Sequence, residues 1–258
     1  MDVLIDRREL LEKARERNLP LTIVEKDYVL GWLLFGFSSM PQLVFKGGTA
    51  LSKIYFPKIW RLSEDLDFTF LSNNWKNITK NLKEIFETIK KKSGIELNLK
   101  NHYSNPEYLQ LKIQYHAVIG KNWVKVDIMK NDLVEKPVKK EMQITYSDYF
   151  PFKIEVESLE EIFAGKLRTV IERKKSRDYF DLWKLSQIKI NKRKLKRIFK
   201  KKCEIKNVKF FGLKQIFPKD IYETLKPYWD KELRRLVSSY PDLEIVISDL
   251  KKALKFLI

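Results

Sequence analysis

The sequence predicts an α+β protein in which a central mixed sheet is flanked by helices and followed by a helical C-terminal half. Three observations support this prediction. Apolar residues have helical spacing over the first forty residues, alternate with polar residues between residues 95 and 129, and return to helical spacing after about residue 155. We therefore expect two regions: residues 1–154, with the N-terminal helices and the sheet core, and residues 155–258, which are helical.

Local signals define the elements of the first region. Thr22 and Glu25 fit a capping box at the start of an apolar helix. The adjacent Gly47 and Gly48 end a buried strand. The pattern predicts strands at 43–45 and 66–71, helices at 50–55 and 75–92, and further strands over 95–129, where apolar and polar residues alternate at 109–115 and at 124–128.

The second region begins with a helix signal and contains a basic helix. Ser158 and Glu161 form a capping-box pattern ahead of apolar positions with helical spacing. Residues 192–202 predict a helix whose apolar stripe docks onto the protein while its cations face outward. Its Lys196, Arg197, Lys200 and Lys201 are expected to contact RNA phosphates.

Charge is the most informative feature of the composition. Lys and Arg total 52 against 34 acidic residues, which gives a formal net charge of +18. Such a chain attracts polyanions, of which nucleic acid is the commonest. The alternative interpretation is solubility, or a lysine-rich proteome in which the charge marks no particular partner.

The rarity of cysteine and histidine limits the metal chemistry. Cys203 is the single cysteine, which excludes an intrachain disulfide, and with only His102 and His116 a structural zinc site is disfavoured. Any metal is then held by carboxylates, which favours Mg²⁺ or Mn²⁺. The N-terminus lacks the pattern of a signal peptide, and the most apolar stretch, 29–37, is too short to span a bilayer. We therefore expect a cytoplasmic protein that makes no use of a membrane.

The strongest chemical signal is a Gly-Gly turn followed by an Asp-x-Asp pair. Gly47 and Gly48 allow the backbone to turn sharply and approach a ligand, and the N–H groups of the following helix suit phosphate. Thr49 and Ser52 add hydroxyl donors to this nucleotide-binding candidate.

Asp65 and Asp67 are separated by one residue, so on a strand both carboxylates face the same side. Two neighbouring carboxylates repel each other, and divalent-cation binding is the usual reason for such a pair. A lone Asp-x-Asp is more often a solvated turn, and a lone Gly-Gly is usually only a turn. The two together, in one strand–turn–helix–strand unit, form a much rarer combination.

The sequence resembles the nucleotidyltransferase superfamily that shares the polymerase-β catalytic core. More closely, it is similar to the AbiEii/AbiGii toxin family of type IV toxin–antitoxin and phage-defence systems. The motifs that carry the resemblance occur in the family's order, at 24–28, 47–52, 63–68, 159–168 and 177–182. The resemblance implies a nucleotidyltransferase fold, an NTP substrate, Mg²⁺ or Mn²⁺ at the site, tRNA as acceptor and a cognate antitoxin protein as partner.

The resemblance also implies roles for residues of the second region. Lys166 should contact the nucleotide phosphates and Asp178 should complete the active site, with Arg177 and Asp181 bracing the motif. From the residues alone, Lys166 could equally be a surface lysine that extends its ammonium into solvent. Asp178 could equally be a helix N-cap.

Asp127 is the candidate for the third carboxylate expected in the polymerase-β core. It is a lone charged residue between apolar neighbours of a predicted strand, where an unpaired charge is costly. It could be a metal ligand or the base that deprotonates the acceptor hydroxyl. The alternative is a solvent-facing strand residue like Lys125. Tyr103, Tyr108 and Trp123 could stack bases, although strand aromatics more often belong to the core.

The hypothesis is transfer of a nucleoside monophosphate from an NTP to an acceptor hydroxyl, with release of pyrophosphate. One alternative is a small-molecule nucleotidyltransferase of the antibiotic-modifying kind, whose acceptor pocket should be acidic, against the excess of lysine here. Another is a non-catalytic RNA- or antitoxin-binding module on the same fold. Asp65 and Asp67 count against it, because a binding module gains nothing from two like charges held together.

Overall fold

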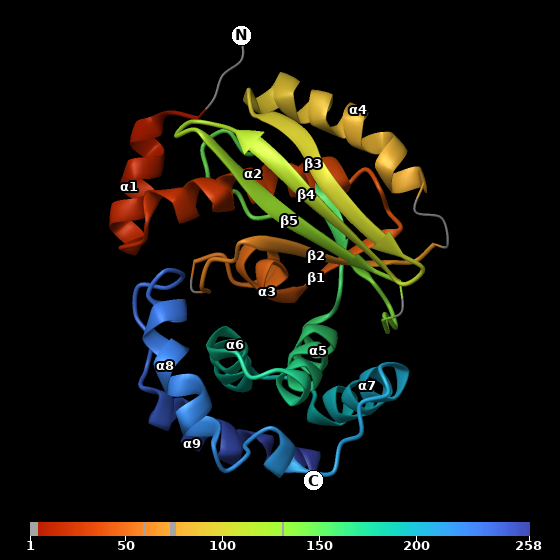
Figure 1. The fold of residues 1–258 in the computed structure, drawn as a ribbon, viewed down its shortest axis with the longest axis vertical. Coiled ribbons are helices and arrows are strands. Elements are labelled where there is room, and N and C mark those ends of the chain that lie inside the picture. Colours follow the sequence, from red (N-terminus) through yellow and green to blue (C-terminus); the bar gives the residue numbers. More distant parts are fainter. Residues whose placement is uncertain (1–4, 59, 73–75, 131) are drawn as a thin grey trace. The chain divides into compact units, whose positions relative to one another are not determined.

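The computed structural model describes residues 5–258 apart from 59, 73–75 and 131 (Figure 1). The chain divides into two compact units. The first comprises Met1–Lys130 and Pro137–Val156, and the second Asn131–Lys136 and Glu157–Ile258. The α+β class is confirmed: the first unit contains a mixed sheet with helices, and the described elements of the second are helical.

The sheet of the first unit contains seven strands among the described residues, in the order β3-β4-β5-β2-β1-β7-β6. β2 pairs in parallel with β5, and β1 in parallel with β7, while the other neighbours are antiparallel. The strands are β1 (Leu43–Lys46), β2 (Asp65–Phe70), β3 (Glu96–Asn105), β4 (Tyr108–His116), β5 (Lys121–Met129), β6 (Val138–Glu141) and β7 (Lys153–Val156).

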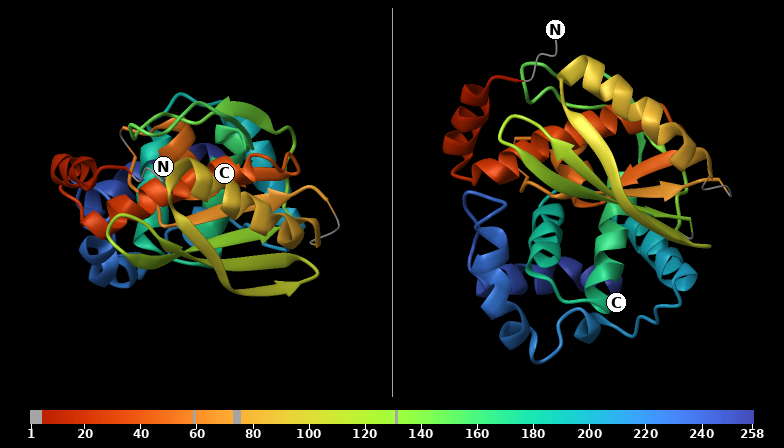
Figure 2. Two further views of the ribbon diagram at one scale, coloured as in Figure 1. Left: turned by 90° about the horizontal axis from the view of Figure 1, so that it is seen from above. Right: turned by 45° about the horizontal axis from the view of Figure 1, so that its top comes forward.

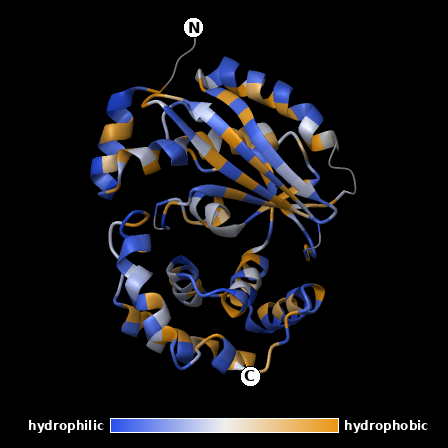
Figure 3. Cartoon of the chain, viewed as in Figure 1, coloured by the Kyte–Doolittle hydropathy of each residue, from blue (hydrophilic) through white to orange (hydrophobic). Residues whose placement is uncertain are grey.

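The two faces of this sheet differ in chemistry because side chains alternate along each strand. Phe68, Leu111 and Val126 are buried on one face, where Phe37 of α2 (Leu21–Phe37) packs on Phe68. The helices α2 and α4 (Lys76–Ser93) pack against each other over this apolar face (Figure 2). Hydrophilic and hydrophobic bands alternate along β3, β4 and β5 (Figure 3). The opposite face is therefore left to polar side chains, including Asp67.

The structure corrects the capping box expected at Thr22 and Glu25. α2 begins at Leu21 with Pro20 in the N-cap position, and no side chain caps it. Pro20 holds its own φ near −57° and places Thr22 inside the first turn. The Glu25 carboxylate instead accepts a hydrogen bond from the backbone N–H of Ile119 at 2.6 Å. Glu25, which the sequence pattern assigned to a capping box, therefore binds the distant turn at Ile119 to α2.

Other elements agree with their sequence signals, with two differences. The helix after the Gly-Gly turn begins earlier than expected: α3 (Gly47–Ala50) continues into a π-helical turn, η1 (Leu51–Tyr55). The strands β6 and β7 were not expected, because four residues are too few for a clear alternation. The helix α1 (Arg7–Arg17) agrees with the helical spacing expected over the first forty residues. None of the described helices is both long and apolar enough to cross a membrane.

The second unit is built around the packing of α5 on α6 and α7. Its helices are α5 (Leu159–Glu172), α6 (Ser176–Ser186), α7 (Lys192–Ile205), α8 (Ile221–Leu233) and α9 (Leu243–Ala253), with short turns η2 (Leu213–Gln215) and η3 (Leu254–Leu257). The capping box of Ser158 and Glu161 is confirmed at the start of α5. Buried Lys202 binds Asp132 and Glu157, at 3.2 and 3.0 Å, and so ties the segment before β6 to α7.

Candidate active site

The Gly-Gly turn leads directly from β1 into α3 and lies against the polar face of the sheet. Gly47 has φ of +79°, and a Cβ there would come within 2.6 Å of Asp67 Oδ2. Only glycine fits this combination of left-handed backbone and close approach. A Cβ at Gly48 would come within 2.8 Å of a guanidinium nitrogen of Arg61. The turn is therefore enclosed between a carboxylate and a guanidinium.

The hydroxyl groups expected to bind phosphate are turned inward. Thr49 and Ser52 are both buried. The Thr49 hydroxyl donates to the carbonyl oxygen of Asp65, and the Ser52 hydroxyl donates to the carbonyl oxygen of Thr49 at 3.1 Å. These bonds fix α3 to the start of β2. They leave the backbone of the turn, rather than the two hydroxyls, as the part suited to approach a ligand.

Asp27, in the motif at 24–28, belongs to a buried ion pair. Its carboxylate pairs with the ammonium of Lys53 at 2.8 Å and accepts a hydrogen bond from Tyr146 at 2.9 Å, and all three side chains are buried. Lys53 belongs to η1, directly after the Gly-Gly turn. The pair thereby anchors η1 to α2 and holds the turn in place. Its charges are committed to each other within the core, so we assign it a structural role.

Asp65, Asp67 and Asp127 lie on one face of the sheet. Asp67 is the register partner of Asp127, and Asp65 is the register partner of Lys125, in the parallel pair of β2 and β5. In-register residues of neighbouring strands point to the same side. The face therefore brings together the three carboxylates that the sequence singles out, beside the Gly47 turn.

Asp127 is neither unpaired nor an ordinary solvent-facing residue. Its carboxylate accepts hydrogen bonds from the Tyr108 hydroxyl at 2.5 Å and the Gln110 amide at 2.9 Å, and pairs with the Lys125 ammonium at 2.8 Å. Only 9% of the residue is exposed. Three donors thus satisfy this carboxylate and fix its orientation next to Asp67.

Lys125 is a site residue that sequence reasoning missed. Its ammonium lies 2.8 Å from Asp127 Oδ2 and 4.0 Å from Asp65 Oδ2. Burial alone would lower the pKa of Lys125, but the hydrogen bond to Asp127 and attraction to Asp65, Asp127 and Asp67 outweigh burial and raise the pKa. The lysine is therefore a fixed cation at neutral pH, and it offsets the repulsion within the carboxylate cluster.

Arg61 is the second residue missed at this site. It is 2% exposed, and it donates to the carbonyl oxygen of Leu62 at 3.0 Å. Because a Cβ at Gly48 would lie only 2.8 Å from the guanidinium of Arg61, this guanidinium places a positive charge directly against the turn. A residue ahead of a predicted strand gives no signal of burial in the sequence, because arginine is usually exposed.

The carboxylate pair fits a hard divalent cation. Mg²⁺ is commonly held by one or two carboxylates together with waters and substrate phosphates. Asp65 and Asp67 supply such a pair on one face of β2. Among the described residues, no three acidic, histidine or cysteine side chains converge into a complete metal cage. The arrangement therefore suits a cation that binds together with a nucleotide.

In the second unit, Lys166 is the centre of a buried ion cluster. Its ammonium lies 2.8 Å from an oxygen of Asp178 and 2.8 Å from one of Asp181, and both carboxylates are fully buried. The Lys166 side chain is only 11% exposed, so it is not a lysine that extends into solvent. Asp178 is not the N-cap either: α6 begins at Ser176, with Lys175 in the cap position.

Arg173 completes this cluster. Its Nε donates to the second oxygen of Asp178 at 3.0 Å. Burial alone would raise the pKa of Asp178, but the charges of Lys166 and Arg173, and their hydrogen bonds, outweigh burial and hold the pKa well below its ordinary value. Asp178 is therefore ionised at any physiological pH. Asp181 does more than the bracing expected of it, because it shares Lys166 with Asp178.

The cations of α7 are partly neutralised within the second unit. Arg197 forms a two-pronged pair with Glu135 at 2.5 and 2.7 Å, and Lys201 lies 3.3 Å from the same carboxylate. Lys196 donates to the carbonyl oxygen of Ile258 at 3.1 Å, while Lys200 is exposed. The expected RNA contacts lie on one helix, but at least two of them already have an acidic partner.

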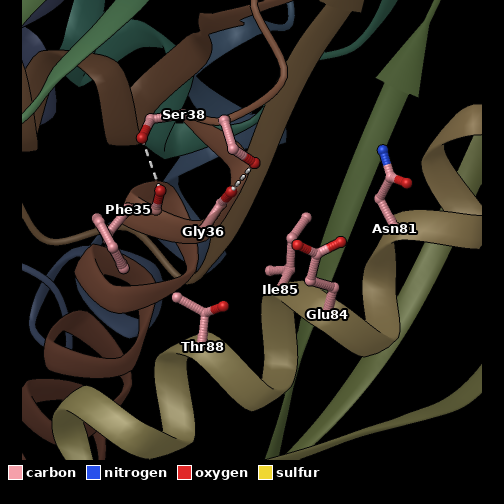
Figure 4. Close-up of a pocket in the computed structure, with 8 residues that line it drawn as sticks. Phe35, Gly36, Ser38, Asn81, Glu84, Ile85 and Thr88 are labelled. Carbon is pink, nitrogen blue, oxygen red and sulfur yellow. Dashed lines mark hydrogen bonds between the residues drawn. The ribbon is translucent and has the colours of Figure 1, made fainter.

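A separate pocket of about 380 Å³ lies between α2 and α4 (Figure 4). Its lining includes Phe35, Ile85 and Glu84, and the hydroxyl of Ser38 donates to the carbonyl oxygen of Phe35. The helices around it cover the apolar face of the sheet, opposite the carboxylates. An acidic residue and no cation among its lining residues make it a poor site for a triphosphate.

The comparisons with known proteins give a consistent result. A family model described as "Nucleotidyl transferase AbiEii toxin, Type IV TA system" matches residues 32–255. MenT4, a nucleotidyltransferase toxin from Mycobacterium tuberculosis H37Rv, matches in structure with a TM-score of 0.77 and 19% identity, covering 98% of this chain and 89% of that one. JHP933 from Helicobacter pylori matches with a TM-score of 0.60 and 19% identity, covering 93% of each chain. No curated protein sequence matches.

Proposed function

Because this chain belongs to the AbiEii family of nucleotidyltransferase toxins of type IV toxin–antitoxin systems, we propose that it transfers a nucleoside monophosphate from an NTP to the 3′-terminal hydroxyl of a tRNA, with release of pyrophosphate. The observation that carries this proposal is the face of β2 on which Asp65 and Asp67 lie against the Gly47 turn. That face combines a pair of cation-binding carboxylates with a backbone that a ligand can approach closely.

In this proposal the residues of the first unit have different roles in the reaction. Asp65 and Asp67 would hold Mg²⁺ or Mn²⁺, which when bound polarises phosphoryl oxygens and offsets the charge of the leaving group. Gly47, Gly48 and Thr49 would cradle the triphosphate through their backbone, with Arg61 offsetting its charge. Lys125 would keep the carboxylates together before substrate arrives.

In this proposal Asp127 receives the proton of the acceptor hydroxyl. Its register partner is Asp67, and Tyr108 and Gln110 fix its orientation. In the proposed step, the acceptor oxygen bonds to the α-phosphorus as the bond from that phosphorus to the bridging oxygen breaks. Pyrophosphate leaves, and the acceptor proton passes to the Asp127 carboxylate. The alternative role of Asp127, as a further metal ligand, requires that Lys125 give up its 2.8 Å contact.

Lys166 would contact the nucleotide phosphates, with Asp178 and Asp181 holding its ammonium in place. The short contacts of 2.8 Å to both acids support a positioned cation rather than a mobile one. Membership of a type IV toxin family further implies a cognate antitoxin, and the formal net charge of +18 supports RNA as the acceptor.

The test is incubation of the purified chain with total RNA and each α-labelled NTP, with and without a chelator of divalent cations. We expect label in RNA of tRNA size, and its loss when the chelator is present. A γ-labelled NTP serves as control and should leave the RNA unlabelled, because the β- and γ-phosphates depart as pyrophosphate. Label in a small molecule, or label that resists the chelator, would contradict the proposal.

The basic helix α7 gives a separate prediction for RNA binding. Replacing Lys196, Arg197, Lys200 and Lys201 together with Gln is expected to lower the slope of log affinity against log salt by roughly 0.7 for each lost phosphate contact. The measurement is a salt titration of RNA binding. Because Glu135 pairs with Arg197 and Lys201, the matched control Glu135→Gln should tighten binding. An unchanged slope in the four-site variant would make α7 a solvated face.

A further inference from the structure

Two large aromatic side chains are exposed on the polar face of the sheet. Tyr103 on β3 is 59% exposed and Trp123 on β5 is 40% exposed. Strand aromatics usually belong to the core, as Tyr115 does in this sheet with 1% exposure. The exposure of Tyr103 and Trp123 therefore requires another explanation.

The strand register places both aromatics on the carboxylate face. Gln110 is the register partner of Tyr103 on one side and of Asp127 on the other, so the three side chains share a face. Trp123 precedes Asp127 by four positions on β5, which also leaves it on this face. From these spacings, Tyr103 lies about 10 Å and Trp123 about 13 Å from Asp127.

Direct contacts connect the aromatics to the site and to cations. The rings of Tyr103 and Tyr108 lie 6.3 Å apart, and the Tyr108 hydroxyl bonds Asp127. The ammonium of Lys112 lies 4.1 Å from the centre of the Trp123 ring, and that of Lys26 lies 5.5 Å from it. The face thus carries two exposed rings, lysines over one of them, and the carboxylates.

This composition matches the requirements of single-stranded nucleic acid. Unpaired bases stack on exposed aromatic rings, while nearby cations neutralise the backbone. Duplex RNA does not fit, because its bases are stacked on each other and a side chain cannot stack on them. A protein partner would be expected to cover a larger apolar area than two separated rings.

We propose that the face formed by Tyr103, Lys112 and Trp123, which we call the acceptor face, binds the single-stranded 3′ end of the acceptor RNA and leads its terminal hydroxyl to Asp127. This inference rests on the proposed function and adds the surface that carries its substrate. By these spacings the two rings lie about 16 Å apart. Bases of non-adjacent nucleotides near the terminus therefore stack on Trp123 and Tyr103, and Lys112 contacts a phosphate of the segment between them.

The test compares two RNA hairpins of the same stem, one with a single-stranded 3′ tail and one blunt. Binding is measured by fluorescence anisotropy in the Asp67→Asn background, so that no transfer occurs during the titration. The double change Tyr103→Ala with Trp123→Ala is expected to weaken binding of the tailed hairpin at least about tenfold, since each stacked base contributes substantially to affinity. Binding of the blunt hairpin should not change.

Two control variants make the result specific. Tyr228→Ala removes an aromatic of α8 that is 54% exposed, and should leave the affinity for both hairpins unchanged. Tyr103→Phe with Trp123→Phe keeps the rings and should retain the affinity for the tailed hairpin. The acceptor face would be overturned if the double alanine variant bound both hairpins equally more weakly, or if it bound them as well as wild type. It would also be overturned if the phenylalanine variant lost affinity for the tailed hairpin while its melting temperature stayed unchanged.

The failure of this inference is distinguishable from failure of the proposed function. If wild type labels RNA and the double alanine variant labels it equally well at limiting RNA, the acceptor face is wrong and the transfer activity stands. If tail binding depends on the two rings but no NTP labels RNA, the acceptor face stands and the proposed transfer fails.

Discussion

Replacing Asp67 with Asn is expected to lower nucleotide transfer about a hundred- to a thousandfold, the loss typical when a group that stabilises developing charge is removed. The amide keeps the size of the side chain but cannot offer two anionic oxygens to a divalent cation. Asp65→Asn should have a similar effect, because Asp65 shares the face of β2. The measurement is incorporation of α-labelled nucleotide into RNA under saturating Mg²⁺.

The fold should survive both substitutions. Neither aspartate belongs to the buried core: Asp65 has 28% of its side chain exposed, and Asp67 is half-buried. Thermal melting of each variant within a few degrees of wild type is therefore the control. Binding of Mn²⁺ in the presence of a non-hydrolysable NTP gives a second readout, which should weaken in both. Substantial residual transfer in either variant would show that Asp65 and Asp67 are not a cation-binding pair.

The corresponding change at Asp127 separates its two proposed roles. If Asp127 acts as the base, Asp127→Asn should lose transfer while keeping Mn²⁺ affinity, and the loss should be smaller at higher pH, where the acceptor hydroxyl ionises more readily. If it is a ligand, Mn²⁺ affinity should fall with activity. The contacts to Tyr108, Gln110 and Lys125 fix the orientation of the carboxylate in either role, and the Mn²⁺ affinity decides between them.

Replacing Asp178 with Ala is expected to destabilise the second unit by about 3–5 kcal/mol, the usual result of removing one partner of a buried ion pair. Asp178 is fully buried between Lys166 and Arg173. The measurement is the free energy of unfolding in urea. Arg173→Gln is the matched control: Arg173 is 47% exposed, so its loss should cost less than about 1 kcal/mol. Equal effects of the two changes would contradict the account of the cluster.

The depressed pKa of Asp178 also predicts how stability depends on pH. Because the folded pKa is below the unfolded value of about 3.9, the contribution of Asp178 is fully present above that value and is lost as pH falls toward the folded pKa. Unfolding of the wild type should therefore become easier below about pH 4. The Asp178→Ala variant should lose less stability over the same range.

The same cluster affects how a nucleotide role of Lys166 can be tested. Lys166→Ala would leave Asp178 and Asp181 buried without their shared cation, so loss of activity could follow from unfolding alone. Lys166→Arg keeps the charge and is the more informative variant. A raised KM for NTP with unchanged RNA affinity would support contact with the nucleotide.

Much of the fold follows from local sequence patterns. The alternation along residues 109–115 predicted a half-buried strand, and β4 has apolar side chains buried on one face and polar ones on the other. The capping box at Ser158 marks the start of α5. By contrast, β6 and β7 are too short to give a periodic signal. At the start of α2, Pro20 occupies the N-cap position that the sequence pattern assigned to Thr22.

In the first unit, the acidic residues of the candidate site were predictable from the sequence, and its cations Lys125 and Arg61 were not. Asp65 and Asp67 stand out because two carboxylates on one strand face need a reason, and Gly47 because adjacent glycines are rare here. Lys125 and Arg61 carry no such signal, since one cation among 52 is unremarkable until the fold places it against a carboxylate or a turn. The pairing of Lys166 with both Asp178 and Asp181 likewise depends on the packing of α5 on α6.

The most direct test of the central claim is the mass of the RNA product. Purified wild-type chain should add to the 3′-terminal fragment of tRNA the mass of one or more nucleoside monophosphate residues, with one pyrophosphate released for each, and the Asp67→Asn chain should leave the fragment unchanged. A gain equal to a phosphate group alone would mean that the γ-phosphate is transferred instead. That result, or an identical product from the Asp67→Asn chain, would contradict nucleotidyl transfer at the β2 carboxylates.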